Sequence, residues 1–376
     1  MRSDAPPPSE PPTSGVLVVG GLYMDVKLEV STYPREDTAC RCISVTKTRG
    51  GNAGNTSVVL GELCGRQSGL SVWWLGSVPP PAVDADAKLV LESLRNSHVN
   101  VDLREEVNDC GLPTAYITIS RETGSRTIVS TRNGMPEVSP EHFSRVLLNV
   151  PQYEFSYRPP WIWCHLECRE LPSVYEMAKA WMKHKIADAR LSVEVEKPSM
   201  NPADVLPLLQ LCDVVFFSRE FVEKHAADVI LAHDTLREVL HDSSREHVAH
   251  QFIRALRMRS NVVRGLWVVP WGVQGAFAVD DVGRGLHEPA CVPDRVVDTT
   301  GAGDTFIAAV IYAILLGHTF ANALRCACAI AGRKVSQVGF DGLSSAMPDD
   351  LGELIGVDRI EAATTGKGQC GEGHRA

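Results

Sequence analysis

Short apolar runs recur along the chain, and each is closed by a glycine or a polar residue. The runs are VLVVG from Val16, VWWLG from Val72, WIWCHLE from Trp161, LSVEVE from Leu191, DVVFFS from Asp213 and LWVVPWG from Leu266. Runs of this length are typical of parallel strands that are buried on both faces. Helical patterns such as NTSVVLGELCG and PSVYEMAKAWMKH lie between them. The alternation predicts an α/β domain with a mainly parallel central sheet covered on both faces by helices.

Two segments break this rhythm because polar and apolar residues alternate within them. They are residues 38–50 and 113–134, and the second contains a turn signal at Thr123-Gly124. The pattern predicts antiparallel lid strands at approximately 36–50 and 112–133, forming a small separate sheet. Ligands of open α/β sheets bind beyond the carboxyl ends of the strands. We expect the small sheet to lie over that end and shield a reacting group from water.

Composition narrows the class of protein. The formal net charge of −9 has no basic stripe to offset it, which argues against a nucleic-acid partner. No apolar run reaches the ~18 residues that span a bilayer, so no membrane partner is expected. Eleven cysteines without a CxxC pair predict reduced thiols in a cytoplasmic protein. Residues 1–14 are predicted to be a disordered proline-rich extension, 15–343 the folded domain, and 344–376 a partly disordered tail.

The stretch DTTGAGDTF, residues 298–306, precedes a long apolar helical pattern. The first N–H groups of a helix have no intrahelical partner, and the helix dipole favours an anion there. Gly301 and Gly303 leave those groups open to a bulky anion, with Ala302 between them, and Asp304 stands beside them as a possible base. This combination indicates phosphoryl transfer. A turn of this kind also occurs where a helix and a strand only need to pack closely.

The stretch RGGNAGNTS, residues 49–57, is the second concentration of glycine. Asn52 and Asn55 carry amides that both donate and accept hydrogen bonds, as sugar hydroxyls require, and Gly51 allows a tight backbone. Either asparagine could instead cap a helix. Asp25 follows the first strand by five residues, where its carboxylate could accept two sugar hydroxyls or cap a loop.

Together, GGNAGN and DTTGAGDTF resemble the two signatures of the ribokinase (PfkB) family of carbohydrate kinases. The stretches YPRED, TRGGNAGN, GSRTIV, LSVEVEKP, RVVDTTGAGDTF and GFDG resemble the ketohexokinase branch of that family, and they extend from Val16 to Gly342. The resemblance implies a ribokinase-like three-layer α/β/α sandwich with a small β-sheet lid. It also implies an ATP-dependent kinase that phosphorylates the 1-hydroxyl of D-fructose and forms fructose 1-phosphate.

The resemblance assigns roles by position. Asp304 matches the catalytic base, and the backbone of Gly301, Ala302 and Gly303 matches the anion hole. The positions that match the sugar pocket are Asp25, Gly51, Asn52 and Asn55, together with Asp304. Arg126 matches a lid residue that reaches phosphate, and the nucleotide-binding turn corresponds to Gly272, Val273, Gln274 and Gly275.

The metal assignment is the least defined part of the resemblance. Mg²⁺ is expected on the ATP phosphates, and a K⁺ requirement is left open. Glu194 and Glu196 are candidates to hold Mg²⁺ through water, with a structural role as the alternative. We expect at most one of them to face the site, on the argument that alternating strand positions point to opposite faces. The Asn-x-x-Glu motif of many family members is replaced here by Ser218 and Phe221.

Two other readings share these motifs. The same fold and chemistry serve kinases of another sugar or of a nucleoside, because the placement of one hydroxyl decides specificity. A non-catalytic sugar or nucleotide sensor is the third reading, although the intact base and glycine turn argue against it. We expect a homodimer in which the lids of two subunits clasp, because an exposed edge strand has unpaired N–H and C=O groups that can pair with another chain.

Overall fold

The computed structural model describes residues 14–65, 69–148, 160–231, 247–261 and 264–343. Ser14, which was predicted to belong to the extension, is the first residue of β1 (Ser14–Val19). The rest of the predicted extension and the predicted tail, residues 344–376, lie outside the described residues. Within the described ranges, no helix has both the length and the apolar character needed to cross a membrane.

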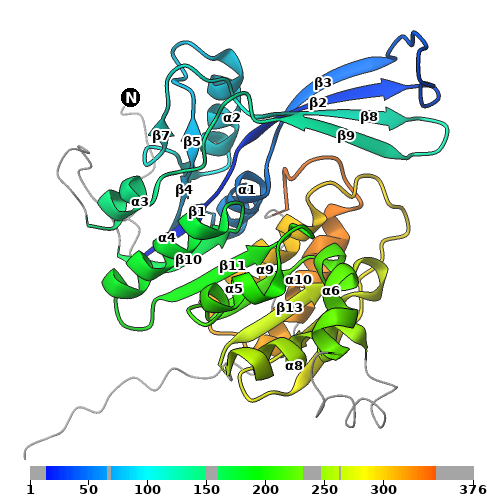
Figure 1. Ribbon diagram of the computed structural model, residues 1–376. Helices are drawn as coiled ribbons and strands as arrows, with labels where there is room; N and C mark the ends of the chain where they lie inside the picture. Colours follow the sequence, from blue (N-terminus) through cyan, green and yellow to red (C-terminus); the bar gives the residue numbers. More distant parts are fainter. Residues whose placement is uncertain (1–13, 66–68, 149–159, 232–246, 262–263, 344–376) are drawn as a thin grey trace, which may run out of the picture.

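Within the described ranges, a nine-stranded central sheet has the order β15-β14-β13-β12-β11-β10-β1-β4-β6 (Figure 1). The strands from β6 to β13 run parallel to their neighbours, whereas β14 and β15 are antiparallel. This confirms the prediction of a mainly parallel sheet. The strands are β1 (Ser14–Val19), β4 (Leu70–Leu75), β6 (Val99–Asn100), β10 (Trp161–Glu167), β11 (Arg190–Val195), β12 (Val214–Phe217), β13 (Leu266–Pro270), β14 (Ala276–Val279) and β15 (Gly285–Glu288).

Helices cover both faces of this sheet. One face packs against α1 (Asn52–Cys64), α2 (Ala85–Asn96), α9 (Ala302–Leu315) and α10 (Phe320–Lys334). The opposite face packs against α3 (Pro140–Leu147), α4 (Leu171–His184), α5 (Pro202–Leu209), α6 (Arg219–Leu231) and α8 (Val248–Ser260). A short pair of strands, β5 (Ser77–Val78) and β7 (Glu105–Glu106), lies beside the body.

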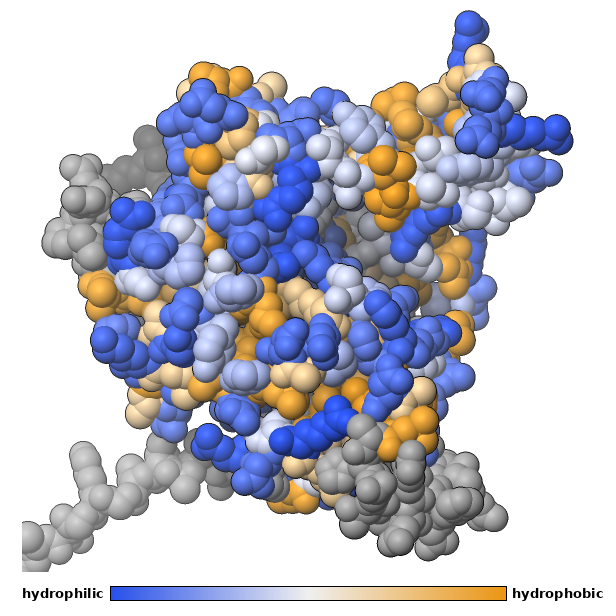
Figure 2. Space-filling view, in the orientation of Figure 1, coloured by the Kyte–Doolittle hydropathy of each residue, from blue (hydrophilic) through white to orange (hydrophobic). Residues whose placement is uncertain are grey.

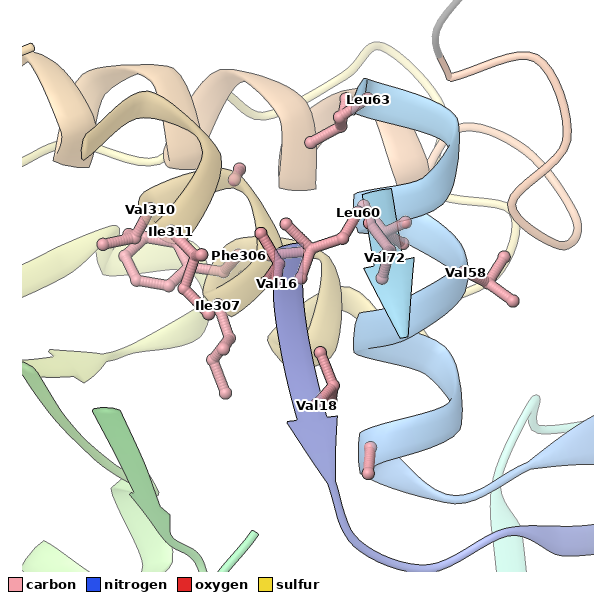
Figure 3. Close-up of a cluster of buried hydrophobic side chains, with 14 of the residues drawn as sticks. Val16, Val18, Val58, Leu60, Leu63, Val72, Phe306, Ile307, Val310 and Ile311 are labelled. Atoms are coloured by element: carbon pink, nitrogen blue, oxygen red, sulfur yellow. The ribbon is translucent and has the colours of Figure 1, made fainter. Parts of the chain in front are cut away.

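Strand β1 shows why its sequence is apolar at every position. Val16 and Val18 enter the core beneath α1 and α9, whereas Leu17 and Val19 enter the core on the other face. Figure 3 shows the first of these cores, where Phe306 of α9 and Leu60 of α1 approach the strand. A strand buried on both faces has no position at which a polar residue would reach water.

The lid is a four-stranded sheet with the order β3-β2-β8-β9, and it projects away from the body (Figure 1). Its strands are β2 (Tyr23–Val30), β3 (Ser44–Gly50), β8 (Thr114–Ser120) and β9 (Arg126–Thr131). The predicted hairpin turn is confirmed, since Gly124 has a φ of 69° and its N–H donates to the Ser120 carbonyl over 2.8 Å.

Two details of the predicted lid were wrong. Residues 36–43 form no strand, and residues 23–30, which were not predicted as a strand, form β2 in the middle of the sheet. β2 also pairs with β8 in parallel, so the lid is not purely antiparallel. The segment MDVKLEV alternates strictly between apolar and polar residues, which is the period of a half-exposed strand. That signal was present in the sequence and was not used in the prediction.

Several helices begin at a side-chain cap, whereas α1 and α9 begin after a glycine. Asp84, Ser139, Asn201 and Thr319 accept a hydrogen bond from the first turns of α2, α3, α5 and α10 through their side chains. By contrast, α1 begins after Gly51 and α9 begins after Gly301, and neither glycine can provide such a cap. The Ala53 N–H in the first turn of α1 donates to Oε2 of Glu167 over 3.4 Å, and the Ala302 N–H at the start of α9 donates to the Thr299 carbonyl over 3.3 Å. The other N–H groups of these first turns have no partner within their own helix.

Candidate active site

The two uncapped helix ends are joined by a side-chain hydrogen bond. Asn55 of α1 donates through Nδ2 to Oδ2 of Asp304 in α9, over 2.7 Å. Asn52 lies one residue after the glycine that precedes α1, and its amide donates toward Glu194 over 3.3 Å. Neither asparagine caps the helix, so the capping alternative was wrong. Both amides instead face the carboxyl edge of the sheet.

The Gly-Ala-Gly turn is shaped by two different demands. Gly301 has a φ of 74°, and a Cβ placed there would lie 2.3 Å from Cζ of Phe340. Gly301 is therefore needed for the turn itself. At Gly303 a Cβ would meet no described atom within 4 Å. Gly303 is exposed, so the space above it is open beside the start of α9.

The Asp304 carboxyl group is buried, with 7% of the residue exposed. Burial raises its pKa above the ordinary value. The hydrogen bond from Asn55 lowers the pKa, the charges of Glu196 and Glu167 raise it, and the charge of Arg49 lowers it. A carboxyl group with a raised pKa is a stronger proton acceptor than an ordinary aspartate, as a general base requires.

Asp25 lies in the lid strand β2, opposite Thr48 of β3, and not in a loop. The loop-cap alternative was therefore wrong. Asp25 is buried, with 9% exposed, and burial raises the pKa of its carboxyl group. A Cβ on Gly50 would lie 2.1 Å from Oδ1 of Asp25, so glycine is required beside this carboxylate. The placement leaves Asp25 at the base of the lid, close to α1.

Glu194 and Glu196 are placed differently from the expectation. Residues two apart in a strand share a face, so the argument that at most one could face the site was wrong. Glu194 is the buried penultimate residue of β11, and Glu196 lies just beyond the strand and is exposed. Both carboxylates interact with Asp304. The charge of Glu196 raises the pKa of Asp304. Burial raises the pKa of Glu194, and the charge of Asp304 raises it further.

No preformed metal site accompanies these carboxylates. Among the residues that the structure describes, no cluster of three His, Cys, Asp or Glu side chains could hold a metal ion. At the position of the missing Asn-x-x-Glu motif, Ser218 accepts a hydrogen bond from the Phe221 N–H and Phe221 is buried in the core. These two residues therefore serve the start of α6.

Arg126 extends from the lid to the glycine turn. Its Nη1 donates to Oγ1 of Thr300 over 3.1 Å, and the Thr300 N–H donates to Oδ1 of Asp298 over 2.9 Å. Asp298 is in turn paired with Lys334, whose fully buried Nζ lies 3.0 Å from Oδ2. The lid, the turn and α10 are thus connected by a continuous polar chain.

The predicted nucleotide turn forms a short 3-10 helix, Gly272–Gln274, after β13. Gly275 has a φ of 89°, and a Cβ there would lie 1.9 Å from the Glu288 carbonyl oxygen. Val273 is 83% exposed, and a Cβ on Gly272 would meet no described atom within 4 Å. β13 runs parallel to β11, with β12 between them, about 10 Å away across the sheet. The turn that follows β13 therefore lies at the same carboxyl edge as Glu194.

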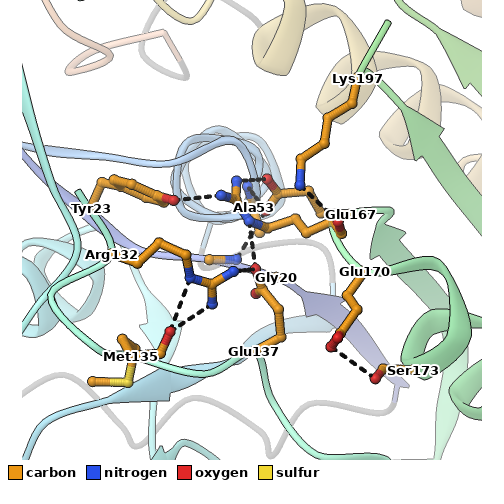
Figure 4. Close-up of polar contacts among 12 residues, drawn as sticks. Gly20, Tyr23, Ala53, Arg132, Met135, Glu137, Glu167, Glu170, Ser173 and Lys197 are labelled. Atoms are coloured by element: carbon orange, nitrogen blue, oxygen red, sulfur yellow. Dashed lines mark hydrogen bonds and ion pairs between the residues drawn. The ribbon is translucent and has the colours of Figure 1, made fainter. Parts of the chain in front are cut away.

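A polar network holds the base of the lid against the body (Figure 4). Arg169, just after β10, donates to the Tyr23 hydroxyl at the start of β2. The same guanidinium pairs with Glu167 over 2.8 Å and with Glu137 over 2.9 Å. Glu137 also pairs with Arg132, directly after β9. Both ends of the lid are therefore fixed to the carboxyl end of β10.

Sequence reasoning missed two residues of this region. Arg49 donates through Nη1 to Oδ1 of Asn55 over 2.5 Å, and Glu167 accepts from the Gly21 N–H through Oε2 over 2.9 Å. Arg49 stands immediately before the glycine pair that attracted attention, and Glu167 is the charged last residue of an otherwise apolar run. The sequence signal for Glu167 was a charged residue at the carboxyl end of a predicted buried strand.

A parallel sheet whose carboxyl edge carries a buried carboxylate, an open glycine-rich helix end and a lid defines a small-molecule phosphotransferase of the ribokinase-like class. The profile of the pfkB family carbohydrate kinases matches residues 13–346. The chain therefore belongs to the pfkB family of carbohydrate kinases. The fold and the ATP-dependent carbohydrate kinase class that the motifs predicted are confirmed.

Individual relatives agree with this assignment. Ketohexokinase of Mus musculus is 32% identical over 335 residues, which cover 87% of this chain and 98% of that protein. Ribokinase of Bacillus subtilis is 24% identical over 330 residues, covering 87% and 94% of the two chains. The structure of Arabidopsis thaliana ribokinase complexed with ribose and ATP is similar with a TM-score of 0.66 at 19% identity, covering 92% and 99%.

Proposed function

We propose that this protein is a ketohexokinase that transfers the γ-phosphoryl group of ATP to the 1-hydroxyl of D-fructose. The products are fructose 1-phosphate and ADP. The single observation that carries the chemistry is the buried Asp304 carboxylate, held by Asn55 next to an uncapped helix end. The choice of a ketohexose rests on the 32% identity to mouse ketohexokinase over nearly the full length of both chains.

In this proposal Asp304 is the general base. Its Oδ2 is bonded to Asn55, so we assign proton acceptance to Oδ1. The carboxylate takes the proton from the sugar 1-hydroxyl as that oxygen attacks the γ-phosphorus. The N–H groups at Gly301, Ala302 and Gly303 would stabilise negative charge on the transferring group because the start of α9 holds them in fixed positions.

The sugar is proposed to lie between α1 and the base of the lid. Asp25 would accept two adjacent hydroxyls, and the amides of Asn52 and Asn55, with the Gly51 backbone, would bind others. Arg126 is already directed at the glycine turn through Thr300, which supports a role in binding phosphate. We place the adenine and ribose along the turn at Gly272, Val273, Gln274 and Gly275.

Mg²⁺ on the ATP phosphates would neutralise charge during transfer, and it needs few protein ligands because it retains most of its waters. The acidic surroundings at Glu194 and Glu196 fit an outer-shell role through water, since both charges act on the Asp304 carboxyl. A requirement for K⁺ is not assigned.

Replacement of the base tests the proposal. Asp304→Asn preserves the size of the side chain and should retain ATP binding, while turnover falls by roughly 10²–10⁴-fold. Asp102→Asn is the matched control, because Asp102 is an exposed aspartate that pairs with Arg95 at the surface. Coupled ADP-release assays measure turnover, and calorimetry measures nucleotide binding. Turnover near the wild-type level in Asp304→Asn would refute the assigned role.

The acceptor is tested separately from the chemistry. The second candidate function is phosphorylation of ribose, supported by the 24% identity to Bacillus subtilis ribokinase. Initial rates should be compared for D-fructose, D-ribose, D-tagatose and adenosine at equal concentrations. The highest kcat/KM is expected with D-fructose. Turnover of ribose or adenosine without turnover of fructose would assign another acceptor within the same family.

We also propose a homodimer formed by the lids and a cytoplasmic location. Strands β3 and β9 are the lid edges, and exposed apolar residues lie on the lid: Val45, Tyr116, Ile128 and Val129. Figure 2 shows hydrophobic side chains among hydrophilic ones on this projecting sheet. Light scattering at micromolar concentration should give a dimer, and Ile128→Glu should weaken it. Val282→Glu, at an exposed turn outside the lid, is the control. A wild-type monomer would contradict the dimer.

A further inference from the structure

Arg49 is a charged residue inside the site that the proposed mechanism does not use. It lies at the end of β3, and its guanidinium contacts three separate elements. Nη1 donates to Asn55 of α1 over 2.5 Å, and Nε donates to Ser93 of α2 over 3.4 Å. The guanidinium also stacks over the Phe340 ring, 5.4 Å from its centroid. These contacts hold the guanidinium in one place relative to Asn55.

We propose that Arg49 is a positioning residue that fixes the Asn55 side-chain amide with its donor end toward Asp304. The inference rests on the proposed role of Asp304 as the base. An asparagine amide has one donor end and one acceptor end, and a 180° rotation exchanges them. Arg49 has only donors to offer and an ionised Asp304 has only acceptors. Between these two groups, the amide satisfies both neighbours in one orientation alone.

The consequence concerns the charge state of the base. If Arg49 were removed, the rotated amide would present Oδ1 to Asp304, which can pair only with a protonated carboxyl. Arg49 therefore favours ionised Asp304 in two ways, through the amide it orients and through its own positive charge. Burial lowers the pKa of Arg49 to about 10, so the guanidinium remains charged at neutral pH.

The other groups around Asp304 mostly oppose its ionisation. Glu196 and Glu167 raise the pKa of Asp304 through their charges, and burial acts in the same direction. Glu194 belongs to the same group of acidic side chains, since its pKa is raised by burial and by Asp304. Lys334 of α10 is another cation on which the charge of Asp304 acts. The hydrogen bonds of its Nζ, however, go to the carbonyl and the carboxylate of Asp298. Asn55 is thus the direct contact that supports the ionised base, and Arg49 acts through Asn55 and through its own charge.

The test is the pH profile of kcat/KM in Arg49→Met, which retains an unbranched apolar side chain without charge. We expect the acid limb to move to higher pH by about one to two units, the usual effect of one neighbouring charge. In the acid range, a shift of one unit is a tenfold loss of kcat/KM. Activity should recover at alkaline pH, where Asp304 is ionised again. A residue needed only for folding would lower activity equally at all pH values.

A matched control and a second variant keep the result interpretable. Arg121→Met removes an exposed lid arginine that pairs with Glu29, and its profile should equal that of the wild type. If Arg49→Met does not fold, Arg49→Gln keeps a hydrogen-bond donor without the charge and should show a smaller shift in the same direction. An unchanged acid limb in a folded Arg49 variant overturns the inference.

A titration without substrate separates this inference from the proposed function. The full-length protein is labelled at aspartate carboxyl carbons, and the Asp304 resonance is identified by its loss in Asp304→Asn. In Arg49→Met the midpoint of that resonance should move upward, and in Arg121→Met it should not. If the wild type phosphorylated no sugar, the proposed function would fail and this titration would still decide the role of Arg49. An identical midpoint in the wild type and Arg49→Met would refute it.

Discussion

Gly303→Ala should separate stability from catalysis in this protein. Gly303 lies in the first turn of α9, and its φ is not in the left-handed region. An added Cβ would meet no described atom within 4 Å, so the folded protein can accept the methyl group without displacement. The open space that accepts it is the space in which we place the transferring phosphoryl group. The substitution therefore leaves the protein folded and obstructs only the reaction.

The two effects have opposite signs and different sizes. Replacing a glycine by alanine at a compatible position stabilises a protein by about 0.4–1 kcal/mol, mainly because the unfolded chain loses freedom. The loss of one anion-hole contact lowers kcat by roughly 10²–10³-fold, or about 2.7–4 kcal/mol in the activation free energy. We expect a small rise in the free energy of unfolding together with a large fall in kcat.

The comparison with Gly301→Ala makes the experiment specific. Gly301 has a φ of 74°, and its Cβ would lie 2.3 Å from Phe340, so this variant should lose stability by about 1–3 kcal/mol. Urea unfolding followed by fluorescence measures stability, and the coupled assay with ATP and D-fructose measures kcat. Wild-type kcat in Gly303→Ala would refute the placement of the phosphoryl group. A loss of stability in Gly303→Ala would contradict the conclusion that the folded protein has room for a methyl group at this position.

Two further predictions use the charges of the site. Because burial raises the pKa of Asp304 and a base must be ionised, kcat/KM should fall with decreasing pH at a midpoint well above that of an ordinary aspartate. A profile that stays flat down to about pH 5 would contradict this. Lys334→Met should lower the free energy of unfolding by about 1–3 kcal/mol, since the partly exposed Asp298 would lose the hydrogen bonds that the buried Lys334 Nζ donates to its carboxylate and its carbonyl. Urea unfolding of Lys334→Met and Lys334→Met/Asp298→Asn measures this, and the double variant should recover part of the loss. A change below about 1 kcal/mol in Lys334→Met would show that the pair is not a stabilising contact.

The sheet and the glycine turn were predictable because their signals are local. Parallel strands that are buried on both faces are rich in apolar residues, and each apolar-rich run quoted from the sequence became a strand of the central sheet. The Gly-Ala-Gly sequence before an apolar helix also specifies its own backbone, since a φ of 74° at Gly301 strongly favours glycine.

The errors occurred where one segment allowed two interpretations. For Asp25 the sequence left a sugar ligand and a loop cap as alternatives, both placed after the first strand, although MDVKLEV has the period of a strand of its own. Asn52 and Asn55 have the residue type of a helix cap, yet Gly51 precedes the helix and their amides bind Glu194 and Asp304. A cap and a site ligand use the same donors, so the residue type alone cannot separate them.

The sequence by itself determined the alternation of strands and helices, the two glycine-rich helix starts and the carboxylate that follows one of them. Each depends on backbone geometry and burial within a few residues. Only the tertiary structure decided that Arg49, Asn55 and Asp304 form one line of hydrogen bonds and charge. These residues belong to β3, α1 and α9, which the crossovers of the sheet bring together at one edge. No local pattern can encode the contact between Asn55 and Asp304, which lie 249 residues apart in the chain, because it forms only where the whole core places both helix ends.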